Sequence, residues 1–115
     1  MLPHERLFQW FKVENEGEQQ RRFESLFHPD AAFDGEASCW GRVQEFVKVT
    51  PALREVRCLV AQGNDDYGVV VVEGRDPATE TWRRVSWAFL ARNGQILKVT
   101  STTSQPLLPP EERMG

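Results

Sequence analysis

The sequence predicts a single α+β domain in which a strongly curved sheet, mixed or antiparallel, wraps round about three helices and encloses one internal pocket. Two observations carry this prediction. Apolar residues recur at helical spacing in the first half of the chain, and four strand-like runs follow one another in the second half. A group of helices followed by a group of strands is typical of α+β proteins, in which the helices pack on one face of the sheet. The expected shape is a cone.

Two amphipathic segments are expected as helices before the first strand. The first helix is predicted over residues 3–13, and the Asn-Glu-Gly-Glu sequence at residues 15–18 indicates a break and an N-cap for the second. Pro29 ends the second helix. The apolar residues of the first helix are Leu7, Phe8, Trp10 and Phe11, and those of the second are Phe23, Leu26 and Phe27.

A short strand and a third helix are expected next. The strand covers residues 32–34, and the helix begins within residues 41–47 and stops at Pro51. Helical spacing places three apolar side chains on one face of this helix, which are Val43, Phe46 and Val47. This face is expected to pack on the sheet.

The second half of the chain is expected to be all strand. Its four runs cover residues 53–62, 67–75, 81–92 and 95–103. The run over 67–75 contains four consecutive valines, as expected of a central strand covered on both faces. Asn93-Gly94 is a strong hairpin signal because both residues tolerate positive φ. We assign residues 1–104 to one domain and residues 105–115 to a proline-rich tail that leaves the sheet.

Length and charge limit the classes of function. The chain has 115 residues, which is enough for one hydrophobic core. A formal net charge of −3 provides no basic field for a phosphate backbone, so no nucleic-acid partner is expected. No apolar run reaches the ~20 residues of a membrane-spanning helix, so we expect no membrane partner.

The cysteines and histidines indicate neither a disulfide framework nor a metal site. Cys39 and Cys58 are the two cysteines, and reduced thiols in a cytoplasmic protein are the expected state. Together with His4 and His28 they show no metal-ligand spacing. We therefore expect no metal and no other cofactor.

Residues 27–33 (FHPDAAF), 41–46 (GRVQEF) and 89–96 (FLARNGQI) together resemble the nuclear transport factor 2-like superfamily. This superfamily includes the ketosteroid isomerases and the SnoaL-like, polyketide-cyclase-like proteins. The resemblance covers about residues 3–104 and implies a cystatin-like cone with one pocket. Because the fold hosts enzymes, binding proteins and assembly domains, it implies no single function.

The resemblance can be carried to single catalytic positions. The carboxylate base of the ketosteroid isomerases falls on Gly35, which is flanked by Asp34 and Glu36. The two hydrogen-bond donors of that branch fall on Trp10 or its neighbour and on Ser86, and none of these is a strong acid. An isomerase of this type is therefore not favoured. Asp34 as an acid or base is kept as an alternative.

On the resemblance, the expected pocket is apolar with a few hydroxyl groups. The family match places the Ser86 face of the long strand inside, together with the Val99 face of the last strand. Arg84 and Trp82 would lie nearer the mouth, where the Arg84 guanidinium could bind a carboxylate through two hydrogen bonds. The alternative is that Arg84 points to solvent. The expected ligand-binding residues are Trp10, Phe33, Trp82, Arg84, Ser86, Val99, Ser101 and Thr103.

The opposite face of the long strand is expected to be a dimer interface. It carries Val85, Trp87 and Phe89, which together form a patch too apolar to face water. In the superfamily the outer face of the sheet commonly pairs with a second copy, which implies a homodimer here. The alternative is that the tail folds back and covers the patch, with Leu107 and Leu108 as plugs.

Two functions of different classes remain. The first is a SnoaL-like domain that binds a small, mainly apolar molecule in the pocket. The second is a non-catalytic dimeric module that binds a protein partner. A weak isomerase, cyclase or dehydratase that uses Asp34 is a further alternative. The glycine at the base position and the missing pocket tyrosine favour a protein that is not an enzyme.

Overall fold

The computed structural model describes residues 1–35 and 41–113. Three α-helices precede a run of four strands in the described chain, and the expected α+β class is confirmed. In chain order the elements are α1 (Pro3–Phe11), α2 (Glu16–Leu26), β1 (Phe27–Phe33), α3 (Val43–Val49), β2 (Arg54–Gly63), β3 (Tyr67–Asp76), β4 (Thr81–Arg92), β5 (Gln95–Thr103) and the short 3-10 helix η2 (Pro110–Glu112).

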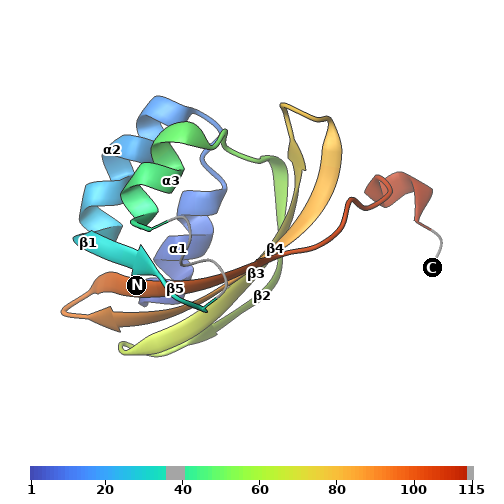
Figure 1. Ribbon diagram of the computed structural model, residues 1–115. Coiled ribbons are helices and arrows are strands. Elements are labelled where there is room, and N and C mark those ends of the chain that lie inside the picture. Colours follow the sequence, from blue (N-terminus) through green and yellow to red (C-terminus); the bar gives the residue numbers. More distant parts are fainter. Residues whose placement is uncertain (36–40, 114–115) are drawn as a thin grey trace.

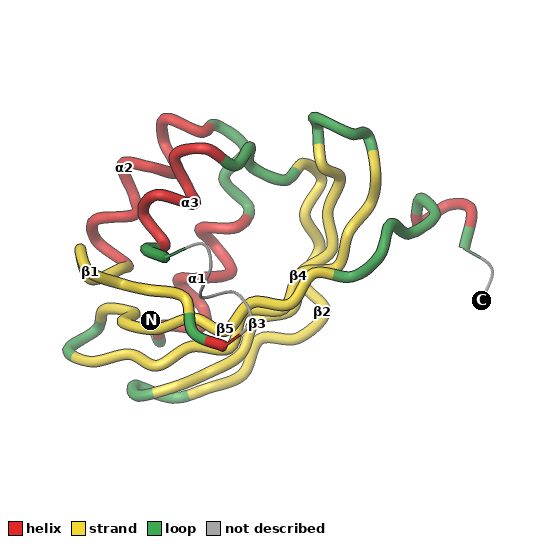
Figure 2. Tube along the Cα trace, viewed as in Figure 1, coloured by secondary structure: helices red, strands yellow, loops and turns green. Residues whose placement is uncertain are grey.

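The five strands form one mixed sheet that does not close on itself. Its strand order is β1-β5-β4-β3-β2. β1 runs parallel to β5, and all other neighbours are antiparallel. The sheet bends round the three helices, which lie together on its concave side (Figures 1 and 2). We call this side the inner face and the opposite side the outer face.

The first two helices follow the expected pattern with small shifts at their ends. α1 buries Leu7, Trp10 and Phe11 and ends at Phe11, two residues before the predicted end. The Asn15 side chain accepts a hydrogen bond from the Glu18 backbone N–H at 2.9 Å, which makes Asn15 the N-cap of α2. The buried side chains pack α1 against the core, and the Asn15 cap fixes the residue at which α2 begins.

β1 is longer than the predicted strand over residues 32–34. It begins at Phe27, directly after α2, and its register with β5 shifts between Phe27 and Ala32. Pro29 lies inside this irregular stretch. Since β1 is an edge strand, the missing N–H of Pro29 is tolerated there.

β4 presents its two faces the opposite way from our expectation. Trp87 lies opposite Ser101 and Phe89 lies opposite Val99 in the register with β5. Residues directly opposite each other in an antiparallel pair share a face of the sheet. Trp87 and Phe89 are 2% and 4% exposed, and both belong to the core under the helices. The prediction that the Ser86 face lies inside is therefore wrong.

The inner and outer faces of β3 are covered to different extents. Val70 and Val72 are fully buried on the inner face, whereas Val69 and Val71 are only half-buried on the outer face. The four valines were expected to be covered on both sides. Among the four valines, those on the inner face alone are fully covered, because all three helices lie there (Figure 1).

The tail after β5 stays in contact with the sheet. The Leu107 N–H donates to the Trp82 carbonyl at 2.8 Å, and the Arg113 guanidinium donates to the Glu73 carboxylate. Trp82 is 8% exposed, while Leu108 is 59% exposed. The tail therefore covers the Trp82 end of the outer face. It does not cover Val85, Trp87 and Phe89, the residues that it was considered to cover.

Candidate functional site

A hollow of about 280 Å³ lies between the helices and the inner face of the sheet. Its apolar lining consists of Trp10, Phe11, Phe46, Val47, Pro51, Ala52, Leu53, Val85 and Trp87. Its polar lining consists of Gln19, Thr50, Asp76, Arg83, Ser101 and Thr103. The two charged groups come from the end of β3 and the start of β4, so they lie at the same end of the sheet.

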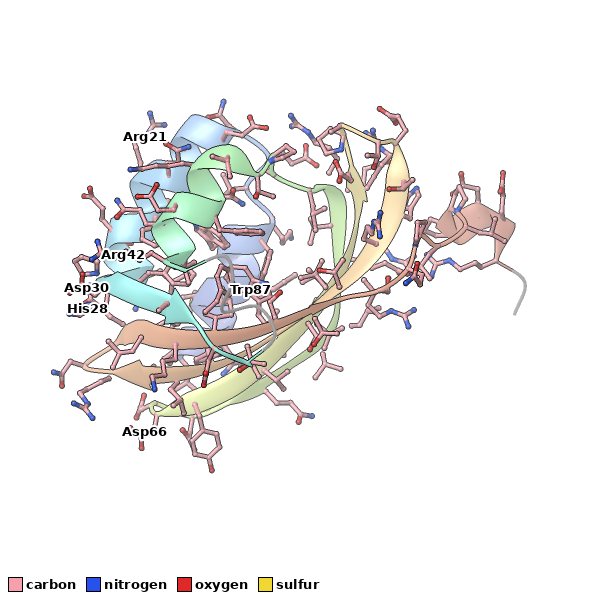
Figure 3. The ribbon with its side chains drawn as sticks, in the orientation of Figure 1. Arg21, His28, Asp30, Arg42, Asp66 and Trp87 are labelled. Carbon is pink, nitrogen blue, oxygen red and sulfur yellow. The ribbon has the colours of Figure 1, made fainter. Side chains whose placement is uncertain are left out.

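Aromatic rings form the apolar side of the hollow around Trp87. The centroid of the Trp87 ring lies 5.0 Å from that of Phe11, 5.6 Å from that of Phe33 and 5.8 Å from that of Trp10. The Phe11 and Phe33 rings meet it edge to face, which is a favourable arrangement of aromatic pairs, and Phe33 supports the Trp87 ring from the core outside the lining. Figure 3 shows Trp87 between the helices and the sheet. These rings provide a rigid surface for an apolar group.

The two indole N–H groups of the hollow differ in their hydrogen bonding. Trp10 Nε1 donates to the Gln19 carbonyl at 2.9 Å, and this contact joins α1 to α2. Trp87 Nε1 makes no hydrogen bond within residues 1–35 and 41–113, and it is not one of the fully buried polar atoms that lack a partner there. The Trp87 side chain lines the hollow, where an acceptor atom of a bound molecule could accept a hydrogen bond from this N–H.

Arg83 and Arg84 are adjacent in the chain and have different surroundings. Arg83 is half-buried and lines the hollow, where its Nη1 donates to the Ser104 carbonyl at 3.1 Å. In the described part of the chain no carboxylate lies within 4.0 Å of the Arg83 guanidinium. Arg84 does not line the hollow, and its Nη2 lies 3.6 Å from Glu73 Oε1. Arg83, and not Arg84, is therefore the arginine in a position to bind a carboxylate in the hollow.

The structure separates the residues that were expected to bind a ligand. Trp10, Ser101 and Thr103 line the hollow together. Phe33 and Val99 are buried in the core outside its lining. The remaining three residues, Trp82, Arg84 and Ser86, lie on the other face of β4.

The residues expected at a dimer interface are inside the subunit. Val85 and Trp87 line the hollow, and Phe89 is 4% exposed in the core. The expectation that they form an outer patch is wrong because the three helices cover that face. The register that follows directly from Asn93-Gly94 would pair Ser86 with Ser101, and an irregularity between Leu90 and Ala91 shifts it so that Trp87 lies beside Ser101.

Sequence reasoning also missed several residues of the hollow. Arg83 and Asp76 are its charged groups, and the segment between α3 and β2 closes one side of it. The residues of that segment in the lining are Thr50, Pro51, Ala52 and Leu53. The sequence assigns Thr50 to the end of the third helix, Pro51 to its stop and Leu53 to the start of a strand, and none of them to a site. Nothing in the periodicity of the segment indicates that it folds over the sheet.

Asp34, the expected alternative acid or base, lies at the end of β1 outside the lining of the hollow. It is exposed, and its Oδ1 accepts a hydrogen bond from the Gly35 N–H at 2.9 Å. Glu36, the other carboxylate beside the expected base position, is outside the described residues. The hollow therefore does not include Asp34.

A second group of charged residues surrounds Glu73 on the outer side of β3. Glu73 is 1% exposed, and its Oε2 lies 3.1 Å from Arg57 Nη2. Arg84 and Arg113 contact its other oxygen. The hydrogen bond from Arg113 lowers the pKa of Glu73, burial opposes this, and the charges of Arg113, Arg57 and Arg84 lower it further. We call these four residues the Glu73 cluster.

An open groove of about 570 Å³ lies between α2 and α3. Long side chains such as Arg21, Glu24 and Lys48 line much of it, and all three residues are exposed. Arg21 extends from α2 away from the sheet (Figure 3). The groove is larger than the hollow, but Phe23 is the one aromatic residue among the described residues that line it, whereas four aromatic residues line the hollow. The hollow is therefore the better candidate for a ligand site.

The described residues bring no set of metal-ligating side chains together. Among them, no group of three or more histidine, cysteine, aspartate or glutamate residues could hold a metal ion. Cys58 is an exposed free thiol, and Cys39 lies outside the described residues. None of the described helices has the length and apolar character needed to cross a membrane.

In comparisons with known proteins, no family model matches this chain and no curated protein matches it significantly. The candidate site therefore depends on the geometry of the hollow. Its combination of aromatic rings, hydroxyl groups and one guanidinium is the feature of the molecule that best indicates a function.

Proposed function

We propose that the protein is a small-molecule-binding domain and that the hollow is its pocket for a small, mainly apolar ligand. The observation that carries the proposal is the lining, which joins buried aromatic rings to a few hydrogen-bonding groups. This combination is typical of ligand pockets. Cavities of about 150 Å³ hold benzene. A hollow of about 280 Å³ accordingly suits one aromatic ring with a short chain.

We also propose that the chain belongs to the nuclear transport factor 2-like superfamily and has its cystatin-like cone. Support comes from the order of the elements, with two helices, a strand, a third helix and four further strands. The curvature of the mixed sheet round the helices agrees with this proposal (Figure 1). On this proposal the hollow corresponds to the pocket of the cone.

Binding, with no reaction attached, is the function that we propose. The charged groups in the lining are Asp76 and Arg83, and the Oδ1 atom of Asp76 already accepts the Ala78 N–H at 2.9 Å. A role of Asp34 as an acid or base is less favoured because Asp34 is outside the lining. The proposal therefore needs only shape, apolar contact and one or two hydrogen bonds.

A titration with a neutral probe tests binding in the hollow. The full chain is titrated with 3-phenylpropan-1-ol and followed by two-dimensional NMR. We expect saturable shifts for the residues of the hollow. The variant Ser101→Leu fills the hollow, while Thr102→Leu adds the same side chain to the exposed neighbour on the other face.

The two variants locate the site. Loss of binding in Ser101→Leu with binding retained in Thr102→Leu is the expected result, and circular dichroism checks that both are folded. Absence of binding to the wild-type chain would contradict the proposal. Equal binding to both variants would show that the probe binds elsewhere.

A second proposal is that two copies pair through the outer face of the sheet. Tyr67 and Leu90 lie opposite each other on this face and are 58% and 52% exposed. Val60, which is 37% exposed, and the half-buried Val71 continue the apolar surface on β2 and β3. These residues take the place of the interface expected at Trp87. The pairing would form the dimeric module considered as the alternative function.

Sedimentation of the full chain over a range of concentrations tests the pairing. We expect a dimer for the wild type and a monomer for Leu90→Arg, because a charge on each copy would meet the apolar surface of the other. The control Val49→Arg alters an α3 residue that is 73% exposed, and it should remain dimeric. A monomeric wild type at high concentration would contradict this second proposal.

A further inference from the structure

The half-buried guanidinium of Arg83 is the feature of the hollow that a purely apolar ligand leaves unused. A guanidinium has five N–H donors. In the described chain Arg83 makes one side-chain hydrogen bond, from Nη1 to the Ser104 carbonyl, and no ion pair. A charge of this kind is best satisfied by an anionic group brought in from outside.

The groups beside Arg83 indicate where an anion would lie. Thr103 lies opposite Val85 in the register, so it is the diagonal neighbour of Arg83 on the inner face. Its hydroxyl and that of Ser101 line the same hollow. On the other side is Asp76, which repels an anion. An anion is therefore expected beside Arg83 on its Thr103 side, away from Asp76.

The number of charges selects the class of anion. A phosphate monoester carries up to two negative charges and would meet one guanidinium and one aspartate in the hollow. A carboxylate carries one charge, and its two oxygens match the fork of a guanidinium through two hydrogen bonds. The single available positive group therefore favours a carboxylate over a phosphate.

We propose that the ligand is a monocarboxylate with an apolar body, whose carboxylate binds Arg83 and whose body packs on the Trp87 ring. The inference rests on the proposed function, because it specifies the ligand of the same hollow. The aromatic rings hold the apolar body, and Arg83 fixes its orientation. The unpartnered Trp87 N–H adds a donor for an oxygen substituent on the body.

The test compares two probes that differ at one group. 3-Phenylpropanoate and 3-phenylpropan-1-ol have the same ring and chain length, and only the first is charged at neutral pH. Affinities are measured by NMR titration of the full chain. We expect the wild type to bind the carboxylate at least about tenfold more tightly than the alcohol.

Three variants assign the preference to Arg83. Arg83→Met should bind the two probes equally, and Arg83→Lys should retain part of the preference because it keeps the charge but loses the fork. Arg84→Met is the matched control on the other face of β4 and should behave as the wild type. Arg83→Lys keeps the test decisive if Arg83→Met fails to fold.

The outcomes separate this inference from the proposed function. Equal affinities of the wild type for the two probes, or a full preference for the carboxylate in Arg83→Lys and Arg83→Met, would overturn the carboxylate inference and leave a neutral ligand site. Absence of binding by both probes to the wild type would overturn the inference and the proposed function together.

Discussion

The two faces of β4 are stabilised in different ways, although they alternate residue by residue along one strand. On the inner face, Trp87 and Phe89 are covered by helices and packed among other aromatic rings. On the outer face, Arg84 takes part in the Glu73 cluster, and further along the strand Leu90 is 52% exposed. The inner face is therefore stabilised by packing. The outer face carries a cluster of charged residues at one end and an exposed apolar surface at the other.

This difference teaches that a strand's alternation identifies two faces but not which of them is covered. Cover comes from elements elsewhere in the chain, here the helices for the inner face and the tail for one end of the outer face (Figure 1). Substitutions on the two faces should therefore have different costs and different dependence on pH.

The largest effect is expected from Trp87→Ala. It removes the ring at the centre of the aromatic group and leaves a cavity, which costs about 3–5 kcal/mol of unfolding free energy. Thr102→Ala on the outer face should change stability by less than about 0.5 kcal/mol, because Thr102 is exposed and lies opposite Ser86. Urea denaturation followed by circular dichroism measures both values. Similar losses in the two variants would contradict the assignment of the faces.

Local signals in the sequence predicted much of the sheet. The bounds of β4 and β5 agree with those expected, and Asn93 and Gly94 both have the positive φ that was predicted for their turn. Such turns are decided by two residues, so a short stretch of sequence is enough. The face of β4 depends instead on its register with β5 and on the helices that cover it.

A smaller loss is expected from Gly68→Ala on the inner face of β3. Gly68 lies opposite Phe89, and an added Cβ would lie 2.8 Å from the Phe89 ring and 2.7 Å from the Gln62 carbonyl oxygen. Overpacking of this kind costs about 1–3 kcal/mol. The outer-face control is Val69→Ala, for which no new contact arises. Denaturation midpoints that fall equally in both variants would contradict the close packing of Phe89 on β3.

The Glu73 cluster leads to a prediction about pH on the outer face. The folded-state pKa of Glu73 is lowered, so its carboxylate stabilises the fold above the ordinary glutamate pKa of about 4.3, and this contribution is lost as pH falls through the lower folded value. Glu73→Gln should cost about 1–2 kcal/mol at pH 7, since a buried charged acceptor is lost. The cost should shrink as the pH falls below about 4.

Denaturation of Glu73→Gln and wild type between pH 7 and pH 3 measures this dependence. Glu45→Gln is the control, because Glu45 forms an exposed pair with Lys48 at 3.9 Å and should change stability little at any pH. A cost for Glu73→Gln that does not vary with pH would show that the carboxylate charge does not stabilise the cluster.

The candidate site was less predictable than the sheet. Arg83 and Arg84 are equivalent in the sequence, and only the face of β4 assigns one to the hollow and the other to Glu73. Arg57, Arg84 and Arg113 approach Glu73 from separate parts of the chain. Contacts between such distant residues are set by strand register and by the path of the tail, which local patterns do not contain.

The smallest predicted effect concerns the tail. Arg113 joins the end of the described chain to Glu73, and the Leu107 N–H bonds to Trp82 earlier in the same segment. Arg113→Met removes one hydrogen-bonded partner of Glu73, but Arg57 and Arg84 still contact the carboxylate, so unfolding free energy should fall by about 1 kcal/mol. The opening of the tail itself should be affected more than global unfolding, because the tail contacts the sheet only at its margin.

Hydrogen exchange measured residue by residue separates the local effect from the global one. In Arg113→Met the Leu107 amide should exchange faster, while the Ala91 amide, which donates to the Asp66 carbonyl at 2.7 Å within the sheet region, should be unchanged. Arg92→Met, which removes an exposed arginine that has no ion pair among the described residues, is the control. Unchanged exchange at Leu107 would mean that the tail is held by the Leu107–Trp82 contact alone, and that the Glu73 cluster stabilises the sheet without anchoring the tail.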